Sequence, residues 1–534
     1  MVAFSIARVH PVLQDAEINC TFDDILAMTD EAFEAYITRM RSTFLRYWDT
    51  EGLAPRRGWT MDDIEEDFAK LAGYPVHEFW TTDDQSNARV IRNTTTLGNS
   101  VNAWNAGRMY ETRINYSLKD DGRSIYDFFA KPELFKRYLP YARRHFLRDS
   151  FYLFASSVLQ RTPLPHRPEL VPESGDAYVR AFAAHARDYQ EYELLIEPIA
   201  IDRGSAYSGY GGKLHDRSPL SLTYAELCAA IADGVLPPVT RRNVQEKHCT
   251  PDYQFHVRQY ARGQRLFPAL FRSFRISMCQ YAVNFPPATA KLLYESFLAH
   301  VESPVVRVWD PSSGWAGRLL GAMSYNRQLP SGQMQSMVYY GTDPNSSFYA
   351  EDGSVYDAIR DAYNRVRMGL SMFDEPHHAT VHQLGSEDFH TTDAFRTHIG
   401  QGDLVFTSPP YFNREAYSED TAQSYKKFSD YDRWRDGFLR PTIENAYAFL
   451  NHNRYFLWNI ADLKMGKDYL PLEADSRRIA EELGFVYKET IYMALANMPG
   501  ANRVSQTGEA TAKNSVKVRG RLMKAEPVFV FWKP

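Results

Sequence analysis

Several features of secreted, membrane and metal-binding proteins are scarce or missing in this sequence. Its 534 residues contain four cysteines (Cys20, Cys228, Cys249 and Cys279), and no two of them form a Cys-x-x-Cys pair. This spacing argues against a zinc ribbon and a disulfide framework, and it suits a reducing compartment. No stretch approaches the roughly 18–20 apolar residues of a membrane span, and no signal peptide is visible at the N-terminus. We therefore expect a soluble, cytoplasmic protein with no membrane contact and no metal site.

A strongly basic overall charge is also missing. Lys and Arg total 61 against 66 Asp and Glu, so the formal net charge is −5. A nucleic-acid partner would therefore require a local positive surface. Hydrophobic residues make up 44% of the chain and charged residues 24%, which are globular values. The length exceeds that of one ordinary core, so we expect two or three domains.

The sequence pattern changes about halfway along the chain. Residues 1–160 have mainly helical patterns, with apolar residues at three- and four-residue intervals over 30–48. Residues 161–283 begin with a proline-rich turn and are expected to form a linker or second subdomain that takes part in substrate recognition. Over residues 284–534, short apolar runs alternate with amphipathic segments. This alternation predicts an α/β domain with a mainly parallel sheet and helices on both faces.

The alternation also predicts the individual elements of this domain. Strands are expected at 305–309, 337–340, 380–384, 404–406, 455–460, 485–492 and 527–532. Helices are expected at 316–323, 355–368, 440–450 and 476–483. No long helical segment separates the last two strands, so we expect them to form an antiparallel hairpin at the end of the sheet.

A stiff corner with the sequence Ser-Pro-Pro-Tyr, at 408–411, follows one of the predicted strands. Pro409 biases Ser408 toward an extended backbone, and neither Pro409 nor Pro410 offers an N–H group. The Ser408 hydroxyl and nearby carbonyls are therefore unused acceptors beside the ring of Tyr411. Such a corner suits a flat ligand that carries an amino group, and a packed strand-to-loop turn is the alternative interpretation.

Three earlier strand ends carry further polar groups. The first is followed by Asp-Pro-Ser-Ser-Gly-Trp-Ala-Gly at 310–317, whose glycines permit a tight turn into a helix, although this is not the Gly-x-Gly-x-x-Gly fingerprint. The second ends at Asp343, where the ribose hydroxyls of a nucleoside would lie. The third is followed by Glu387 and Asp388, which are able to meet an adenine edge. Together the strand ends predict a cofactor site beside the Ser-Pro-Pro-Tyr corner.

Residues 284–534 resemble the S-adenosylmethionine-dependent amino-methyltransferases that act on DNA bases. Residues 284–297 resemble the family's segment that closes over the methionine part of the cofactor, and 310–317 resemble its glycine loop. Thr-Ser-Pro-Pro-Tyr at 407–411 matches its catalytic motif. The glycine loop departs from the family's commonest form by continuing Trp-Ala-Gly-Arg at 315–318, a variant associated with methylases of phages and mobile elements. The resemblance implies a Rossmann-like methyltransferase fold that follows a largely helical N-terminal region.

The resemblance and the local chemistry together imply roles for individual residues. Catalysis is assigned to Ser408, Pro409, Pro410 and Tyr411. S-adenosylmethionine binding is assigned to Asn284, Phe285, Asp310, Ser312, Gly314, Gly317, Asp343, Glu387 and Asp388. DNA contacts are expected from Phe412 at the rim of the base site, and from the basic tail residues Arg503, Lys513, Lys517 and Arg519. The composition of residues 499–515 in that tail is typical of a mobile loop, and a solvated loop without DNA contacts is the alternative.

The hypothesis that follows is methyl transfer from S-adenosylmethionine to an exocyclic base amine of DNA. Ser408 and a proline carbonyl would accept the two amine hydrogens and aim the nitrogen lone pair at the methyl group. A base in double-stranded DNA would flip out and stack on Tyr411. The absence of a Pro-Cys dipeptide disfavours methylation at carbon 5 of cytosine. By resemblance, serine at the first motif position favours cytosine-N4 over adenine-N6.

Other functions are compatible with the same residues. A catalytically silent nucleic-acid-binding scaffold would keep the sheet without turnover, and RNA, protein or a modified base would replace DNA as the substrate of a related enzyme. A restriction nuclease within the chain is disfavoured, because no carboxylate-x-Lys strand follows Pro-Asp at 251–252. Only about ninety residues separate the glycine loop from the catalytic motif. Target recognition is therefore expected from the N-terminal region, from loops such as 412–436, or from the basic tail.

Overall fold

The computed structural model describes residues 11–21, 24, 27–52, 59–114, 123–134, 194–197, 220–222, 254–256, 282–370, 375–465, 468–495 and 514–534. The chain divides into two compact units, one of residues 1–9, 50–127 and 280–534 and one of residues 10–49 and 128–279. These units differ from the expected domains 1–160, 161–283 and 284–534, because residues 50–127 pack with the C-terminal half of the chain.

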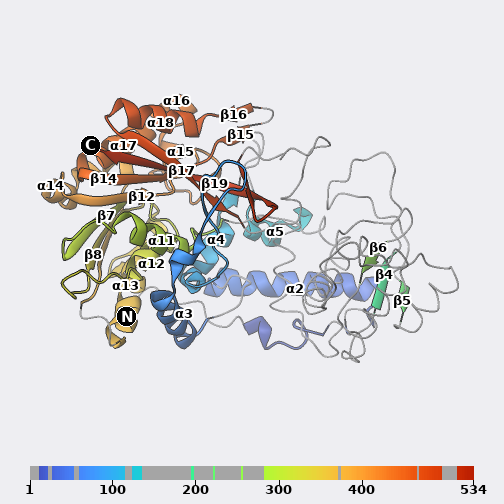
Figure 1. Ribbon diagram of the computed structural model, residues 1–534. Coiled ribbons are helices and arrows are strands. Elements are labelled where there is room, and N and C mark those ends of the chain that lie inside the picture. The colour runs from blue at the N-terminus through green and yellow to red at the C-terminus, as the bar shows by residue number, and fades with distance from the viewer. Residues whose placement is uncertain are drawn as a thin grey trace, which may run out of the picture. The chain divides into compact units, whose positions relative to one another are not determined.

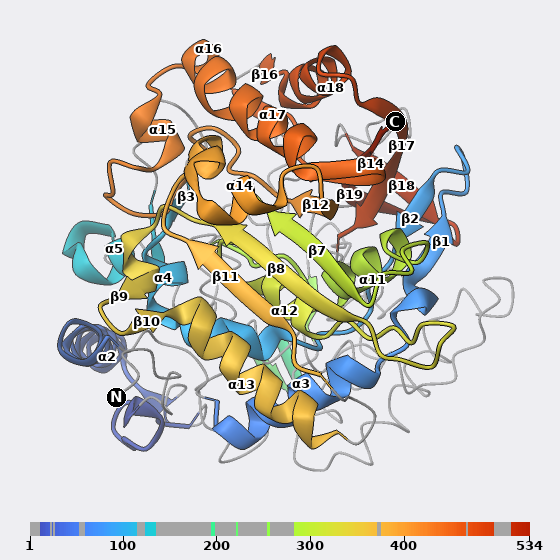
Figure 2. The same cartoon turned by 90° about the vertical axis from the view of Figure 1, so that its left-hand side faces the viewer.

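A ten-stranded mixed sheet forms the centre of the first unit (Figures 1 and 2). Its strands lie in the order β1 (Trp80–Thr82), β2 (Arg89–Ile91), β17 (Val486–Ala494), β19 (Arg521–Lys533), β14 (Leu450–Asn459), β12 (Gly402–Thr407), β7 (Val305–Asp310), β8 (Ser336–Thr342) and β11 (His378–His382). The tenth strand, β18 (Ser515–Val518), pairs with β19. Every strand expected from the sequence is present, and β11 lies two residues earlier than the expected 380–384.

Pairing directions in the sheet agree with the α/β prediction. The neighbours β11, β8, β7, β12 and β14 are all parallel. β19 is antiparallel to both β14 and β17, which confirms the expected hairpin at the end of the sheet. β2 extends the sheet by pairing in parallel with β17. The sequence did not predict this extension, because a three-residue strand is too short to carry a hydrophobic period.

Helices cover both faces of the sheet (Figure 2). One face packs against α11 (Pro287–Phe297), α12 (Gly317–Met323), α13 (Val355–Gly369) and α3 (Met61–Gly73). The other face packs against α14 (Asp393–His398), α17 (Arg440–Phe449) and α18 (Leu472–Glu482). Leu404 and Phe406 of β12 join the first core and Val405 joins the second. β12 is therefore buried on both sides, which is typical of a central parallel strand.

The N-terminal segment 59–114 is an integral part of this unit. Lys291 lies buried in α11 and donates from Nζ to the carbonyls of Leu71, Ala72 and Tyr74, at 2.9, 2.6 and 3.1 Å. These carbonyls stand at the C-terminal end of α3, where helix carbonyls have no partner within the helix. Burial lowers the pKa of Lys291, and neighbouring Glu295 opposes this effect. A lysine of the C-terminal half thus caps a helix of the N-terminal segment.

Short elements connect these layers: η2 (Val76–Phe79), η3 (Asn99–Asn105), α4 (Ala106–Glu111), β3 (Arg113–Ile114), η5 (Ser346–Phe348), β9 (Tyr349–Ala350), β10 (Gly353–Ser354), η6 (Ser386–Thr391), β13 (Glu415–Ala416), α15 (Ser424–Lys427), α16 (Tyr431–Trp434), the π-helix η7 (Arg435–Leu439), β15 (Leu463–Met465) and β16 (Asp468–Leu470). β3 pairs with β13, so the chain that follows β12 is held by the N-terminal segment.

The second unit contains η1 (Pro11–Leu13), most of α2 (Asp30–Glu51) and a small sheet of β5 (Leu220–Leu222), β4 (Leu194–Glu197) and β6 (Gln254–His256). α2 confirms the helix expected over 30–48 and buries a stripe that includes Tyr36, whose hydroxyl donates to the Ile18 carbonyl at 2.7 Å. α5 (Ile125–Ala130) ends in this unit. Among the described helices, none has the length and hydropathy that crossing a membrane requires.

Candidate active site

The carboxyl ends of the parallel strands bring the predicted groups to one edge of the sheet. β7 ends at Asp310, β8 ends one residue before Asp343, and β12 ends one residue before Ser408. β11 is followed by η6, which contains Glu387 and Asp388. Ligands of open α/β sheets bind at this edge, so the fold positions the predicted residues where chemistry is expected.

Asp310 is a buried hub that joins three strands and α12. Its Oδ1 accepts from the Thr407 hydroxyl at 2.7 Å and from the Ser312 amide at 3.2 Å. Its Oδ2 accepts from Arg318 Nε at 2.9 Å and from the Tyr339 hydroxyl at 2.7 Å. With 0% exposure and two donors on each oxygen, the carboxylate is fully used inside the protein. Asp310 therefore shapes the glycine loop through these four bonds, and the cofactor contact expected of it stays a prediction.

Arg318 completes this ion pair beneath the loop. Its guanidinium also donates to the Ser312 carbonyl and lies 5.6 Å from the ring centroid of Phe285. Burial alone would lower the pKa of Arg318, but the carboxylate of Asp310 outweighs that effect and raises it. Arg318, which belongs to the stretch where the glycine loop departs from the family's commonest form, is thus the counter-ion of Asp310. Ser312 itself is half-buried at the edge of the loop.

Gly314 and Asp343 tie the loop to the end of β8. Gly314 has a φ of +52°, a left-handed conformation that favours glycine, and its amide donates to Asp343 Oδ2 at 2.9 Å. Asp343 Oδ1 accepts from the Asn345 amide at 2.9 Å, and the Tyr356 hydroxyl donates to the Gly314 carbonyl at 2.9 Å. Burial raises the pKa of Asp343 to about 6, against the two backbone hydrogen bonds that lower it. Each oxygen of this buried carboxylate accepts one of these backbone bonds and retains a second lone pair.

Asn284 and Gly317 hold the glycine loop from outside. Asn284 Oδ1 accepts from the Gly317 amide at 3.0 Å, and its Nδ2 donates to the Trp315 carbonyl at 2.8 Å and to Asn102 Oδ1 at 3.0 Å. A Cβ on Gly317 would stand 2.1 Å from the Phe285 carbonyl oxygen. The glycine is therefore required by the close approach of the chain at 284–285. Asn284 and Gly317, both expected to bind cofactor, are used here to join two segments of the protein.

One further residue at this position escaped the sequence reasoning. Asn105 of η3 is fully buried and donates from Nδ2 to the same Trp315 carbonyl at 3.2 Å. Phe285, by contrast, was expected to bind cofactor; its ring packs edge-on against Phe406 of β12, with ring centroids 5.3 Å apart. The Asn-rich composition of residues 92–105 was the only available signal for Asn105, and composition alone does not identify a partner 210 residues away.

Glu387 and Asp388 differ in environment although they are neighbours in sequence. Glu387 is 4% exposed, and its Oε1 accepts from Lys427 Nζ at 2.8 Å. Its Oε2 is buried and has no hydrogen-bond partner among the described residues. Burial raises the pKa of Glu387, and Lys427 opposes this. Asp388 is exposed and accepts from the same Lys427 at 2.7 Å. Of the two, Glu387 holds the unused acceptor.

The Ser-Pro-Pro-Tyr corner keeps its polar groups at a partly exposed position. Ser408, Pro410 and Tyr411 are half-buried, whereas Pro409 is buried. Burial raises the pKa of the Tyr411 hydroxyl well above its usual range, and the charge of Glu526 raises it further. Hydrogen bonding with the Ser408 side chain acts in the opposite direction. The serine hydroxyl and the tyrosine hydroxyl are therefore neighbours at the strand end.

Phe412 occupies the core and does not lie at the rim where we expected it. It is 6% exposed, has a φ of +52°, and packs against Tyr431 and Trp434 with ring centroids 5.9 and 5.8 Å away. The left-handed backbone at this residue reverses the chain after the corner, and the ring is consequently directed into the second core cluster. Phe412 anchors the corner from behind.

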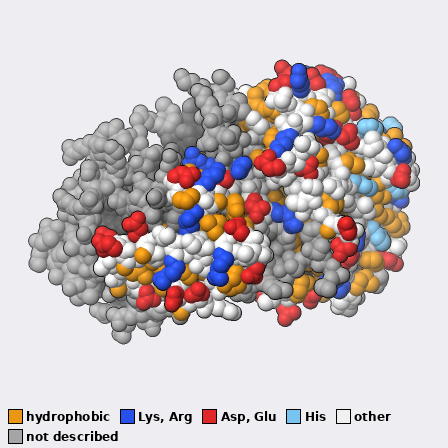
Figure 3. Space-filling model, turned by 180° about the vertical axis from the view of Figure 1, so that it is seen from behind, with side chains coloured by type: hydrophobic (Ala, Val, Ile, Leu, Met, Phe, Trp, Pro, Cys, Tyr) orange, Lys and Arg blue, Asp and Glu red, His pale blue; other side chains and the backbone are white. Residues whose placement is uncertain are grey.

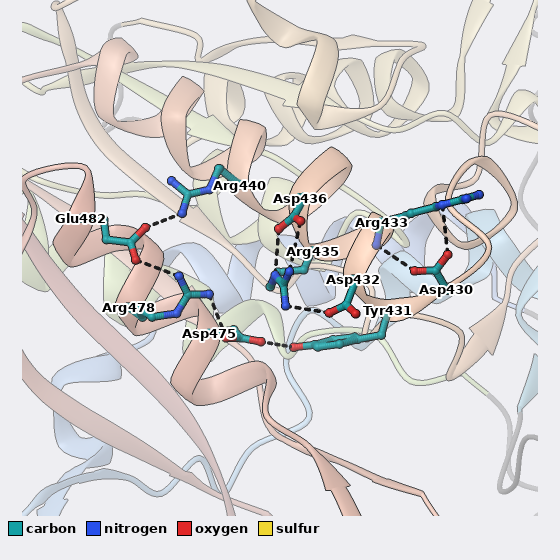
Figure 4. Close-up of polar contacts among 10 residues, drawn as sticks. All are labelled: Asp430, Tyr431, Asp432, Arg433, Arg435, Asp436, Arg440, Asp475, Arg478 and Glu482. Carbon is teal, nitrogen blue, oxygen red and sulfur yellow. Dashed lines mark hydrogen bonds and ion pairs between the residues drawn. The ribbon is translucent and has the colours of Figure 1, made fainter.

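An ion-pair network lies on the helices that follow this anchor (Figure 4). The Tyr431 hydroxyl donates to Asp475 of α18 at 2.8 Å, and Arg478 contacts both Asp475 and Glu482. Arg435, at the start of the π-helix, pairs with Asp432 and Asp436. Exposed pairs of this kind contribute little individually. The hydrogen bond between Tyr431 and Asp475 joins α16 to α18, and the ring of Tyr431 packs against Phe412.

The basic tail is only partly described. Lys517 lies in β18, where its amide donates to Asp83 Oδ1 at 2.7 Å, and Arg519 is exposed in the following turn, where its amide donates to Asp84 Oδ1 at 3.3 Å. Residues 515–518 are thus a strand and not part of a loop. Arg503 and Lys513 lie outside the described residues, as does most of the segment 499–515.

Comparison with known proteins identifies the C-terminal segment. Residues 402–518 match the family model of N6/N4 DNA methylases, which confirms the resemblance seen in the sequence over a segment that contains the Ser-Pro-Pro-Tyr corner. The matched segment begins with β12 and does not include the glycine loop. No curated protein matches the chain.

Several solved structures align with parts of the chain. TTHA0409 of Thermus thermophilus, named as a candidate DNA modification methylase, is 20% identical and aligns over 27% of this chain and 50% of its own, with a TM-score of 0.18. TrmN of Thermus thermophilus is 14% identical over 53% of this chain and 56% of its own, with a TM-score of 0.25. An S-adenosylmethionine-dependent methyltransferase of Methanosarcina mazei is 10% identical over 45% of this chain and 96% of its own, with a TM-score of 0.23. The chain spans about half the length of the first of these proteins.

Proposed function

We propose that this protein is a DNA methyltransferase that moves the methyl group of S-adenosylmethionine to an exocyclic base amine. The observation that carries the proposal is the half-buried corner of Ser408 and Tyr411, which lies at the carboxyl end of β12 within the segment that matches N6/N4 DNA methylases. The corner combines hydrogen-bond acceptors with an aromatic ring, which are the two features that a flat amine requires.

The residues at the neighbouring strand ends fit a nucleoside cofactor. Among the described residues, none hydrogen-bonds to one buried oxygen of Glu387, and such an acceptor suits the exocyclic amine of an adenine ring. Asp343 keeps lone pairs on both oxygens after its backbone bonds, and ribose hydroxyls are suitable donors to them. Ser312 and the backbone of Gly314 lie at the half-buried edge of the loop. When bound, S-adenosylmethionine supplies an electrophilic methyl group.

The chain's own residues orient the target amine. The nitrogen lone pair of a base amine is delocalised into the ring, so the amine is a poor nucleophile. The Ser408 hydroxyl and the Pro409 carbonyl accept its two hydrogens, which favours a pyramidal nitrogen and aims the lone pair. The ring of Tyr411 stacks on the base, which has to leave the duplex to reach it. Serine at the first position favours cytosine-N4 over adenine-N6.

In this proposal, the positively charged surface that contacts the DNA phosphates is confined to a small part of the protein. Lys and Arg side chains are mixed with Asp and Glu on the face shown in Figure 3, as the net charge of −5 leads one to expect. In the proposal, Lys517 and Arg519 on the β18–β19 hairpin contact phosphates together with Arg503 and Lys513. Binding should therefore weaken steeply as the salt concentration rises.

Methyl transfer by wild-type protein and two Tyr411 variants tests the proposal. Tyr411→Ala removes the stacking ring, and because stacking contributes about 1–3 kcal/mol per base, transfer to genomic DNA should fall about fivefold to 150-fold. Tyr411→Phe keeps the ring and should retain most of the activity. Calorimetry should show nearly equal S-adenosylmethionine binding by all three proteins.

The substrates in this assay separate the proposal from its rivals. Radioactive methyl transfer is measured in parallel on double-stranded DNA, single-stranded DNA and RNA. Transfer to RNA alone would replace DNA as the substrate. Cofactor binding without transfer to any of them would favour a catalytically silent scaffold, and equal activity of the Ala and wild-type proteins would refute the stacking role.

A further inference from the structure

Glu526 of β19 stands at the same level of the sheet as the Ser-Pro-Pro-Tyr corner. Across β12, β14 and β19, Thr407 is level with Trp458, and Trp458 is level with Phe529. Counting outward from this row, Ser408 is level with Asn459 and Val528. Glu526 lies two residues farther out along β19, which β14 separates from β12.

Glu526 also lies on the same face of the sheet as Ser408. Successive side chains of a strand alternate between faces. Val528 and Val530 of β19 belong to the first core cluster, as does Phe406 of β12. Glu526 precedes Val528 by two residues within β19 and so points to the face of that cluster, and Ser408, one residue beyond the end of β12, follows Phe406 by two. The carboxyl and the serine hydroxyl thus border the same space at the carboxyl edge.

The carboxyl group of Glu526 is unused within the described part of the chain. It is half-buried and makes no hydrogen bond with the described residues, while its charge is felt by the Tyr411 hydroxyl. The charged groups that face it are Lys524 on its own strand and Glu415 on β13. Unlike Glu526, Glu415 has a partner, because the Tyr417 hydroxyl donates to its Oε2. An unpaired, partly buried carboxyl beside the stacking ring calls for a ligand group.

We propose that Glu526 hydrogen-bonds the ring nitrogen next to the amine-bearing carbon of the target base. This inference rests on the proposed function and extends it to a residue of the last strand. Cytosine carries N3 and adenine carries N1 at this position, and both are acceptors that become free when the base leaves its pair. A neutral carboxyl has an O–H donor for this nitrogen, and the two amine hydrogens stay with Ser408 and Pro409.

The electrostatic surroundings favour this neutral form. Burial raises the pKa of Glu526, Lys524 lowers it, and Glu415 raises it again, with a net upward shift. A base contact by the neutral acid would be lost as the pH rises through this pKa. Glutamine keeps an N–H donor at every pH, so Glu526→Gln should preserve the contact and remove its pH dependence.

Two variants and a matched control test the inference on full-length protein with genomic DNA. Glu526→Ala should lower kcat/KM for methyl transfer about tenfold to hundredfold, the usual cost of leaving a hydrogen-bond partner unpaired. Glu526→Gln should retain activity within a few-fold and show a flatter decline toward high pH than the wild type. Glu489→Gln, on β17 where the carboxylate pairs with Arg89 at 2.8 Å, is the control and should leave methylation unchanged.

A deaza base then reports whether the contact is direct. In a duplex that carries a mapped methylation site, the ring nitrogen of the target base is replaced by C–H. The wild type should lose about tenfold or more in kcat/KM, and Glu526→Ala should lose little beyond its existing deficit. Equal, additive losses in both proteins would overturn the contact, as would full activity of Glu526→Ala. If the wild type methylates no DNA although it binds S-adenosylmethionine, the proposed function fails first, and that outcome is distinct from additivity.

Discussion

The two halves of the carboxyl edge use their polar groups in different ways. In the cofactor half, at the ends of β7, β8 and β11, most of the predicted residues are engaged by the protein itself. Asp310 accepts four hydrogen bonds from the protein, and the side-chain oxygen and nitrogen of Asn284 both form hydrogen bonds within the protein. In the base half, Ser408 and Tyr411 beyond the end of β12 and Glu526 within β19 stay partly exposed.

This difference means that residues of the cofactor half mainly maintain the structure, whereas residues of the base half are available to contact a substrate. The cofactor half is a scaffold in which charges and glycines build a loop of defined shape, leaving a few acceptors such as Glu387 Oε2 for the ligand. The base half presents side chains that stay partly exposed, although Ser408 and Tyr411 hydrogen-bond with each other. Substitutions in the cofactor half should therefore cost mainly stability, and substitutions in the base half should cost mainly turnover.

The largest stability loss is expected from Asp310→Asn. This change leaves the guanidinium of Arg318 buried without its counter-ion, which typically costs about 3–5 kcal/mol. Urea unfolding should show the loss directly. Asp432→Asn, which breaks an exposed pair with Arg435, should change the free energy of unfolding by less than about 1 kcal/mol. A loss at Asp310 as small as at Asp432 would contradict the role of Asp310 as a buried hub.

The pH dependence of stability should report on Asp343. Its pKa is about 6 in the folded protein and near 3.8 in the unfolded chain, so folding favours the protonated form. The stability contributed by that proton is complete below pH 3.8 and is lost as the pH rises through about 6, a change on the order of 2–3 kcal/mol. The difference in unfolding free energy between wild type and Asp343→Asn should therefore vary between about pH 4 and 6. A constant difference would show that this carboxyl does not titrate as described.

Gly317→Ala should destabilise the loop by close contact alone. The added Cβ would stand 2.1 Å from the Phe285 carbonyl oxygen, and overpacking of this kind costs about 1–3 kcal/mol. At Gly369, the last residue of α13, a Cβ meets nothing within 4 Å, and Gly369→Ala should be neutral or slightly stabilising. Thermal melts of both variants provide the comparison. Equal melting temperatures would remove the packing argument for Gly317.

The smallest expected effect is on S-adenosylmethionine affinity, and it tests whether Glu387 or Asp388 contacts the cofactor. Glu387→Ala removes the unpaired buried acceptor and should weaken S-adenosylmethionine binding about tenfold, or roughly 1–2 kcal/mol. Asp388→Ala removes an exposed carboxylate and should change the dissociation constant less than about twofold. Isothermal calorimetry distinguishes them, and the reverse ranking would place the cofactor contact at Asp388.

Much of the fold was accessible from the sequence because strand and helix periods alternate clearly in the C-terminal half. β7, β8 and β12 were expected nearly at their observed bounds, since a run such as Leu404 to Phe406 has few other interpretations. The Ser-Pro-Pro-Tyr corner was equally readable, because prolines restrict the backbone locally. These predictions depended only on neighbours in sequence.

The remaining features depend on partners distant in sequence. Lys291 reads as an ordinary polar residue of an amphipathic helix, yet it caps α3 more than two hundred residues away. Phe412 was expected at a rim, and a left-handed backbone directs it into the core instead. Glu526 follows a basic stretch and has no motif of its own. Its place near the corner emerges only from the register of three paired strands and from its effect on the pKa of the Tyr411 hydroxyl.

One measurement tests the central claim most directly. Wild-type protein and Ser408→Ala are incubated with genomic DNA and S-adenosylmethionine carrying a deuterated methyl group, and the digested nucleosides are analysed by mass spectrometry. The account predicts deuterated N4-methylcytosine from the wild type, or N6-methyladenine if the base preference is reversed, and a strong loss of that product from the variant. Label on carbon 5 of cytosine, or equal labelling by wild type and Ser408→Ala, would contradict methyl transfer to an amine at this corner.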